Sequence, residues 1–251
     1  MSITQTHITI ITPCYNEGIV VTRFLEHLEN ILATLPYNFC VLVINDGSTD
    51  NTPGLLKDFQ FKIDNAGLDT LNLEHNVGHQ SAIYHGLLHA QTYESRHFII
   101  MDCDGQDSPS AIPLLLKYKD ADIVNVVRSK RRESMVFRLF YQVYKIIFRV
   151  VTGKQMNFGN FCLINRNILE RAIELSFAHF AAFLSRQKGS IKSIVVAREV
   201  RIGGQSKMGF KKLFYHALKS FAEYEKDTPM LKFLFLKRSF RNRIDLQDRT
   251  R

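Results

Sequence analysis

Short apolar runs alternate with amphipathic stretches along most of the chain, and turn-forming residues separate them. The runs are rich in β-branched side chains, as in strands buried on both faces. Between the runs, apolar side chains recur every three or four residues, which is the spacing of a helix packed on one face. The expected strands are 7–12, 39–45, about 70–74, 97–102, 121–127, 161–164 and 191–199. The expected helices are 18–35, 78–92, a short one after Pro109, 133–151, two ending by 187, and one from about 210.

This alternation predicts an α/β fold, with a doubly wound, mostly parallel sheet and helices on both faces. Ligands of such sheets bind in the crevice at the carboxyl ends of the strands. Polar segments occupy four of those ends, namely 13–17, 45–50, 74–78 and 102–106. The sequence therefore predicts a polar binding site at that edge of the sheet.

The chain has 251 residues, of which 45% are hydrophobic and 23% charged, a composition typical of a globular protein. It excludes a disordered chain, a collagen-like repeat and a coiled coil. The formal net charge is +9. Residues 128–149 hold seven basic side chains and one acid, and residues 207–251 hold twelve and five. Charge gathered in two bands favours a charged partner on one side of the molecule.

Candidate chemistry gathers at the predicted strand ends. Asp102 and Asp104 follow an apolar strand at a spacing that lets both carboxylates share a hard divalent ion such as Mg²⁺ or Mn²⁺, with Gln106 close by. Asp46, in a turn that also caps a helix, points from a strand end toward a nucleobase or ribose. The histidines at positions 75, 79 and 85 lack metal-ligand spacing and are interpreted as ordinary helix and loop residues.

Five motifs in this order, PCYNE, VINDGSTDNT, HNVGHQSAIYHGL, IIMDCDGQD and RIGGQSKM, resemble family-2 glycosyltransferases of the GT-A fold. The resemblance covers about residues 7–226 and is strongest to dolichyl- or polyprenyl-phosphate hexose transferases. It implies a single domain over 1–226, with a nucleotide-binding half (1–105) and an acceptor-binding half (106–226). Residues 227–251 form a basic tail.

The resemblance further implies a UDP- or GDP-sugar donor, Mg²⁺ or Mn²⁺, and inversion at the anomeric carbon. The implied donor-binding residues are Pro13, Tyr15, Glu17, Asp46, Asp102, Arg128 and Ser206. The implied metal ligands are Asp102, Asp104 and Gln106. The implied catalytic residues are Asp104, Arg131, Arg201 and Lys207.

Departures from the family pattern bear on the acceptor. Asn45 replaces the first acid of an Asp-Asp-Gly-Ser motif, and Asn160 replaces the acid of a Gly-Asp-Phe-Arg-Leu motif. Residues 175–190 also contain no acid where relatives that glycosylate hydroxyls keep a general base. A phosphate needs no base whereas a hydroxyl does, so the expected acceptor is a polyprenyl phosphate. A saccharide or lipid-linked hydroxyl acceptor, and a catalytically weak nucleotide-sugar-binding protein, remain open alternatives.

Residues 136–150 form a helical wheel with one apolar arc and a basic edge, which suits an interface with an anionic membrane surface. No run is long enough to span a bilayer, no targeting peptide is evident, and four scattered cysteines favour a reducing compartment. The expected location is the cytoplasmic face of the membrane, held peripherally or by a membrane-protein partner. A nucleic-acid partner is not expected, because basic charge alone does not explain the carboxylates at the strand ends.

Overall fold

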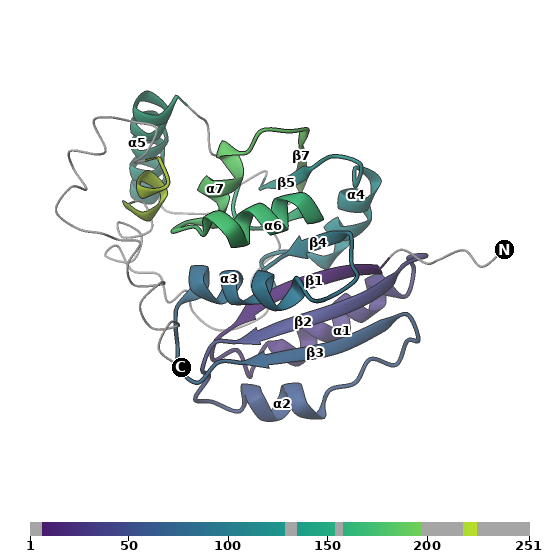
Figure 1. Cartoon of the computed structure of the whole chain (residues 1–251). Helices are drawn as coiled ribbons and strands as arrows, with labels where there is room; N and C mark the ends of the chain where they lie inside the picture. Colours follow the sequence, from purple (N-terminus) through teal and green to yellow (C-terminus); the bar gives the residue numbers. More distant parts are fainter. Residues whose placement is uncertain (1–6, 129–134, 154–157, 197–217, 225–251) are drawn as a thin grey trace. The chain divides into compact units, whose positions relative to one another are not determined.

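The computed structural model describes residues 7–128, 135–153, 158–196 and 218–224, shown in colour in Figure 1. These residues fall into two compact units. The first contains 7–128, 158–175 and 189–196, and the second contains 135–153, 176–188 and 218–224. The single domain over 1–226 stays a prediction.

The first unit is built on one seven-stranded sheet with the strand order β3-β2-β1-β4-β6-β5-β7 (Figure 1). The strands are β1 (His7–Cys14), β2 (Asn38–Asn45), β3 (Ala66–Asn72), β4 (His97–Ile100), β5 (Ile123–Arg128), β6 (Cys162–Asn165) and β7 (Ile191–Val196). Strand β6 runs antiparallel to both of its neighbours, and the other neighbouring pairs are parallel. The predicted mostly parallel sheet is therefore confirmed.

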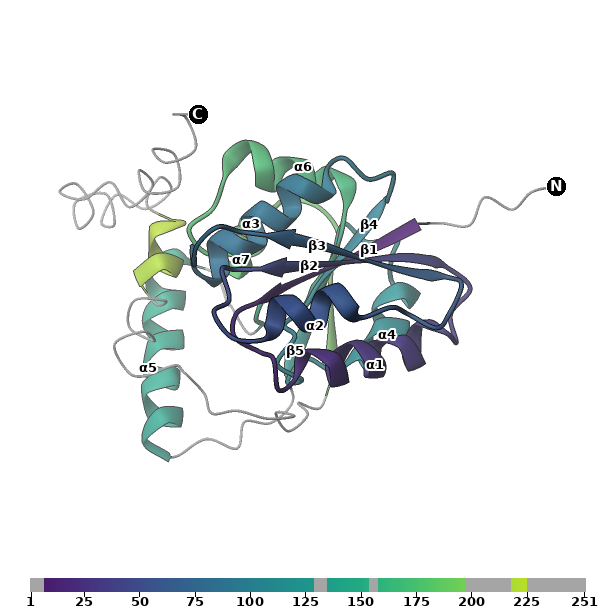
Figure 2. The ribbon, with the colours of Figure 1, turned by 90° about the horizontal axis from the view of Figure 1, so that it is seen from below.

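Helices cover both faces of this sheet. In the first unit they are α1 (Val21–Leu32), α2 (Thr52–Asp58), α3 (His79–Ala90), α4 (Ile112–Lys117), preceded by the 3₁₀ turn η1 (Pro109–Ala111), and α6 (Arg166–Leu175). Figure 2 shows α1, α2 and α4 on one face and α3 and α6 on the other. This is the doubly wound arrangement that the alternating pattern predicts.

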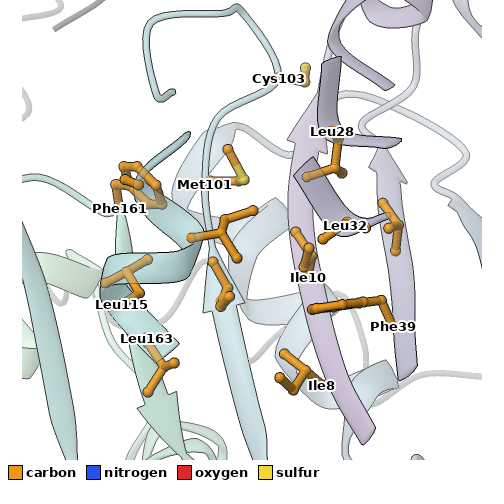
Figure 3. Packing of buried hydrophobic residues seen from close by; sticks show 14 of the residues in the cluster. Ile8, Ile10, Leu28, Leu32, Phe39, Met101, Cys103, Leu115, Phe161 and Leu163 are labelled. Carbon is orange, nitrogen blue, oxygen red and sulfur yellow. The ribbon is translucent and has the colours of Figure 1, made fainter. Parts of the chain in front are cut away.

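The main core lies between the sheet and the helices α1 and α4, which cover one of its faces (Figure 3). Helix α1 buries Phe24, Leu28 and Leu32, whose spacing of four residues places them on one side of the helix. They pack against Ile8 and Ile10, which alternate along β1 toward the same face. Each such buried side chain contributes about 1.5–3 kcal/mol relative to full exposure. Core packing thus holds β1 and its polar end in place.

Helix α3 lies very close to the opposite face of the sheet. A Cβ atom on Gly86 would come within 2.7 Å of Ile11 Cγ2 and of Ile44 Cδ1, so only glycine allows this approach. The close contact fixes the start of α3, at His79, near the ends of β1 and β2.

Strand β3 lies a few residues before its predicted position, at Ala66–Asn72 rather than about 70–74. It is an edge strand that pairs only with β2, and most of its side chains are half-buried. A half-exposed edge strand does not need a continuous apolar run, which explains the misplacement. Residues 197–199 of the last predicted strand, and 210–217 of the last predicted helix, lie outside the described residues, whereas 218–222 are helical.

The second unit contains α5 (Met135–Thr152) and α7 (Phe180–Arg186). Phe148 of α5 is buried, and its ring centroid lies 5.4 Å from that of Phe221 and 5.4 Å from that of Tyr224. Ala182 of α7 joins this cluster. Aromatic packing therefore holds one side of α5 to the rest of its unit.

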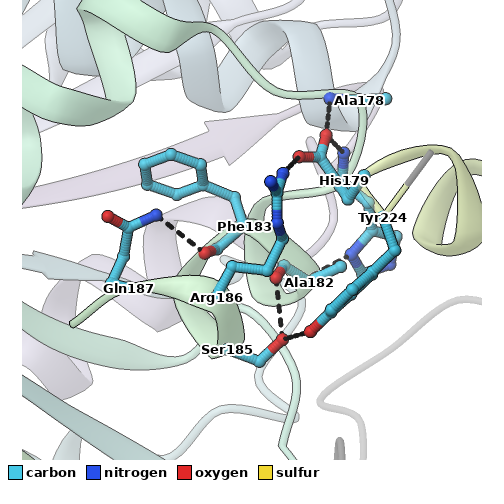
Figure 4. A network of polar contacts seen from close by, with 9 residues as sticks. Ala178, His179, Ala182, Phe183, Ser185, Arg186, Gln187 and Tyr224 are labelled. Carbon is cyan, nitrogen blue, oxygen red and sulfur yellow. Dashed lines mark hydrogen bonds and ion pairs between the residues drawn. The ribbon is translucent and has the colours of Figure 1, made fainter. Parts of the chain in front are cut away.

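Polar contacts surround Arg186 and Tyr224 in this unit (Figure 4), and buried Glu223 takes part in them. Its carboxylate accepts hydrogen bonds from the backbone N–H groups of Ala178 and His179 and lies 3.7 Å from the Arg186 guanidinium. The Arg186 guanidinium in turn covers the Tyr224 ring at 5.5 Å. Because both charged groups are paired, Glu223 acts here as a structural acid.

None of the helices within the described ranges is long and apolar enough to cross a membrane.

Candidate active site

The ends of β1, β2 and β4 meet at one edge of the sheet in the first unit. The backbone N–H of Asp46, just after β2, donates to the carbonyl of Cys14 at the end of β1, with an N···O distance of 2.8 Å. The Cys103 thiol, after β4, lies 3.3 Å from the carbonyl oxygen of Pro13. The polar segments that the sequence places at these three strand ends are therefore brought together.

Asn16 joins the segments that follow β1 and β2. Its backbone is in the left-handed region, with φ of 54°, which asparagine tolerates better than most residues. The side-chain oxygen accepts hydrogen bonds from the backbone N–H groups of Thr49 at 2.8 Å and Asp50 at 3.3 Å. The Asn16 backbone N–H donates to the Ser48 hydroxyl at 2.9 Å. Sequence reasoning missed this role, although Asn16 lies inside the PCYNE motif.

Asp46 is buried, and its carboxylate holds the loop that leads from β3 into α3. It accepts hydrogen bonds from the backbone N–H groups of Val77 at 2.7 Å and Gly78 at 3.1 Å, and from the Asn76 amide at 3.0 Å. Burial raises the pKa of Asp46, and the two backbone donors act in the opposite direction. Its assignment to the donor nucleoside stays a prediction.

Gly47 allows this loop to pass close to the turn after β2. Its φ of +64° lies in the left-handed region, and a Cβ atom there would lie 2.5 Å from the carbonyl carbon of His75. Both the conformation and the space thus demand glycine. The Asp-Gly pair in the VINDGSTDNT motif has a structural explanation in this contact.

Asp102 and Asp104 follow β4 on a tight, hydrogen-bonded turn. The backbone N–H of Asp102 donates to the Asp107 carboxylate at 3.0 Å, and the backbone N–H of Gln106 donates to the Asp104 carboxylate at 2.9 Å. Asp107 is buried, whereas Asp102, Asp104 and Gln106 are half-buried. The turn therefore presents two carboxylates and an amide together at the strand end.

His79 and Asn160 complete the group of polar side chains at this edge, and neither was expected as a site residue. His79 begins α3, and its Nε2 lies 3.4 Å from Asp102 Oδ1 and 2.9 Å from Asn160 Nδ2. Burial lowers the pKa of His79, while the charges of Asp107, Asp104 and Asp46 act in the opposite direction. Asn160 was noted only as a departure from the family pattern. For His79, the sequence feature that could have indicated a site residue was its position directly after Gly78, at a predicted strand end.

Some of the remaining predicted site residues lie within the described part of the chain, and others lie outside it. Tyr15 is exposed and Glu17 half-buried in the segment after β1, and Arg128 is the last residue of β5. Because β5 runs parallel to β4 in the sheet, Arg128 ends at the same edge. Four predicted residues lie outside the described residues: Arg131, Arg201, Ser206 and Lys207.

The donor set suits a divalent ion that is shared with a substrate. Within the described part of the chain, no group of three or more His, Cys, Asp or Glu side chains is arranged to hold a metal alone. Mg²⁺ commonly uses only one or two carboxylates together with substrate phosphates. The oxygen donors of Asp102, Asp104 and Gln106 fit that pattern, and they fit Mg²⁺ and Mn²⁺ alike.

Comparison with known proteins places this chain in a family. The family model described as Glycosyl transferase family 2 matches residues 9–190. The glycosyltransferase YkcC of Bacillus subtilis is 27% identical over 214 residues, which are 82% of this chain and 64% of YkcC. The undecaprenyl-phosphate 4-deoxy-4-formamido-L-arabinose transferase of Klebsiella pneumoniae is 28% identical over 151 residues, 59% of this chain and 45% of that protein. The chain thus spans less than two thirds of the length of these curated relatives.

Solved structures share the fold. Glucosyl-3-phosphoglycerate synthase from Mycobacterium tuberculosis, crystallised with Mn²⁺, UDP and glucosyl-3-phosphoglycerate, matches with a TM-score of 0.63 and 14% identity over 90% of this chain and 81% of that one. The mannosyltransferase PcManGT from Pyrobaculum calidifontis, crystallised with GDP-Man and Mn²⁺, matches with a TM-score of 0.60 and 19% identity over 93% and 70%. With the family match over most of its length, this chain belongs to Glycosyl transferase family 2 and has the GT-A fold.

Proposed function

We propose that this chain is an inverting, metal-dependent glycosyltransferase that moves a sugar from a UDP- or GDP-sugar to a polyprenyl-phosphate lipid. The observation that carries the acceptor choice is Asn160, an uncharged amide at the edge of the sheet where the strand-end carboxylates gather. The Klebsiella relative is named for transfer that involves undecaprenyl phosphate, which supports the same acceptor class.

The donor half of the proposal rests on the carboxylates at the strand ends. Asp102, Asp104 and Gln106 would hold the divalent ion, and a bound ion neutralises the charge that builds up on the leaving nucleoside diphosphate. Tyr15 and Glu17 lie after β1, where an aromatic face and a carboxylate suit a base and a ribose. Two structural neighbours were crystallised with Mn²⁺, one with UDP and one with GDP-Man, which supports a nucleotide donor and leaves both nucleotides open.

The acceptor half rests on proton transfer. In an inverting reaction an acceptor oxygen bonds to the anomeric carbon as the bond to the diphosphate breaks. A phosphate oxygen is already charged near neutral pH, so it attacks without giving up a proton. A hydroxyl must lose its proton to a base within about 2.6–3.2 Å. Cationic residues such as Arg128 can orient a phosphate, which is catalysis by positioning.

We expect a transfer assay with radiolabelled UDP- and GDP-sugars to give product with polyprenyl phosphate and none with free polyprenol or a lipid-linked saccharide. The three acceptors share the same apolar chain and differ in the attacking group, so the comparison isolates the role of the phosphate. Omitting the divalent ion should abolish the product. Transfer to polyprenol or to the saccharide, with none to the phosphate, would overturn the acceptor assignment.

Transfer to a hydroxyl is a second candidate function, and the position of His79 favours it. An imidazole is the commonest general base in enzymes, and this one lies 3.4 Å from Asp102. If His79 served as that base, its replacement by alanine would lower kcat by about 10²–10⁴-fold with the hydroxyl acceptor. The acceptor panel and this variant together separate the two functions.

We also propose that α5 attaches the protein to an anionic membrane surface. Ile146, Ile147 and Val150 are 62%, 48% and 78% exposed, while Phe148 between them faces the core of its own unit. Exposed Arg149 belongs to the basic band over 128–149. A helix with an outward apolar strip and basic neighbours suits the headgroup region of a bilayer.

Replacing Ile146, Ile147 and Val150 together with serine is expected to weaken binding to vesicles containing anionic lipid by at least about tenfold, because apolar area no longer leaves water. Binding of the unchanged protein should also weaken with salt, which screens the basic residues. Flotation of the full chain with vesicles measures both effects. Leu175→Ser, which removes an exposed apolar side chain from α6, is the matched control. Equal binding to neutral vesicles, or binding that survives the triple change, would contradict this attachment.

A further inference from the structure

His79 makes two contacts through a single ring nitrogen. Its Nε2 lies 2.9 Å from the Asn160 side-chain amide and 3.4 Å from Asp102 Oδ1. The His79 side chain is 36% exposed and that of Asp102 is 29% exposed. Asn160 Oδ1 is buried and has no hydrogen-bond partner among the residues that the structure describes. The imidazole edge is thus occupied by the amide on one side and the carboxylate on the other.

The chemistry of the carboxylate decides where the proton of the neutral ring lies. A carboxylate only accepts hydrogen bonds, so an Nε2 lone pair facing Asp102 would be repelled. With the proton on Nε2, the ring N–H side faces Asp102 Oδ1 at an N···O distance of 3.4 Å, an electrostatic contact that is longer than a usual hydrogen bond. A half-turn of the Asn160 amide exchanges positions that are nearly equivalent in shape, and it presents the amide oxygen to the same N–H. One donor then lies between two oxygen acceptors.

We propose that His79 is a positioning residue, which orients the Asp102 carboxylate and is itself held by Asn160. This inference rests on the proposed function, because Asp102 matters here as a ligand of the divalent ion. Loss of a side chain that orients a metal-binding group commonly costs about 10–100-fold in metal affinity or activity. Asn160 supplies an acceptor oxygen and carries no charge. A carboxylate at position 160 would add a further negative charge and be repelled by the acids at this edge, which are Asp46, Asp102, Asp104 and Asp107.

The loop before α3 explains how His79 reaches this place. Gly78, directly before it, has φ of +90°, and its backbone N–H donates to Asp46. The buried Asp46 carboxylate therefore fixes the residue that precedes the ring. Two carboxylates at different strand ends are thus linked through neighbouring residues, Asp46 through the Gly78 backbone N–H and Asp102 through the His79 side chain.

The experiment measures binding of Mn²⁺ in the presence of UDP or GDP, by titration calorimetry, beside kcat and KM for transfer. His79→Ala is expected to weaken Mn²⁺ binding by about 10–100-fold, and Asn160→Ala by less. His79→Gln, whose amide N–H reaches a similar position, should recover most of the affinity. His89→Ala is the matched control, because His89 is on the same helix, is 38% exposed and lies 3.5 Å from Asp69. Thermal melts establish that each variant is folded.

The outcomes test the positioning role of His79 and the proposed metal dependence separately. Mn²⁺ binding by His79→Ala that equals that of the unchanged protein would overturn the positioning role. A fall in kcat with unchanged Mn²⁺ affinity would also overturn it, since that result belongs to a general base. If the unchanged protein bound no Mn²⁺ with either nucleotide, the proposed metal-dependent function would fail first, and this inference with it.

Discussion

Replacing Asp104 with alanine is expected to lower kcat by about 10³-fold and to remove Mn²⁺-dependent binding of the donor nucleotide, while the protein stays folded. Asp104 is half-buried on the turn after β4, two residues after Asp102, and its carboxylate accepts a hydrogen bond from the backbone N–H of Gln106. Losing one of two carboxylates from a shared ion leaves the charge of the departing diphosphate poorly stabilised, and single electrostatic groups of this kind contribute about 10²–10³-fold or more. Because the residue lies at the end of the strand, the core does not depend on it.

The measurement compares initial rates and nucleotide binding, with and without Mn²⁺, for purified folded protein. Asp120→Ala is the control, since it removes an exposed acid just before β5 and so changes the net charge equally. The control should behave like the unchanged protein. An Asp104→Ala variant with full activity would remove the basis for the metal assignment.

Replacing Asp46 with alanine is expected to lower the free energy of unfolding by about 2–4 kcal/mol and to abolish donor binding. The change leaves the backbone N–H groups of Val77 and Gly78 and the Asn76 amide without their acceptor. A fully buried donor left unsatisfied costs about 1–3 kcal/mol, and each of these costs less, because Val77 and Gly78 are half-buried and Asn76 is exposed. The loop into α3 would then no longer place His79 beside Asp102.

Urea unfolding followed by circular dichroism measures the loss of stability, and nucleotide titration measures the loss of binding. Asp58→Ala, at the exposed end of α2, is the control. It removes the same charge from an exposed position and should change the free energy of unfolding by less than about 0.5 kcal/mol. Unaltered stability of Asp46→Ala would mean that the loop does not depend on this carboxylate.

The internal strands were predictable because burial on both faces imposes a continuous apolar run, as in β2 with its sequence NFCVLVIN. The edge strand β3 lacks that constraint and was misplaced. The direction of β6 could not be read from four residues, CLIN, because apolar character does not encode strand direction. The direction of β6 depends instead on the edge of the sheet at which the chain enters this strand.

The direction of β6 also explains which site residues the sequence could reveal. Asp46, Asp102 and Asp104 follow parallel strands, so the rule about carboxyl ends finds them. Asn160 precedes its strand, and it reaches the same edge only because β6 runs the other way. Asn16 and His79 act through hydrogen bonds to neighbouring segments, and the spacing of residues along one segment does not predict such contacts.

The place of β6 beside β4 has a consequence for how the chain is made. Strands β1 to β4 are complete by Ile100, but the partner on the free side of β4 begins only at Cys162. Until the ribosome has released that later segment, the backbone of Phe98, Ile99 and Ile100 forms an unpaired apolar edge. Such edges promote pairing between nascent chains. Slow or interrupted synthesis between these two points therefore leaves this apolar edge open to aggregation.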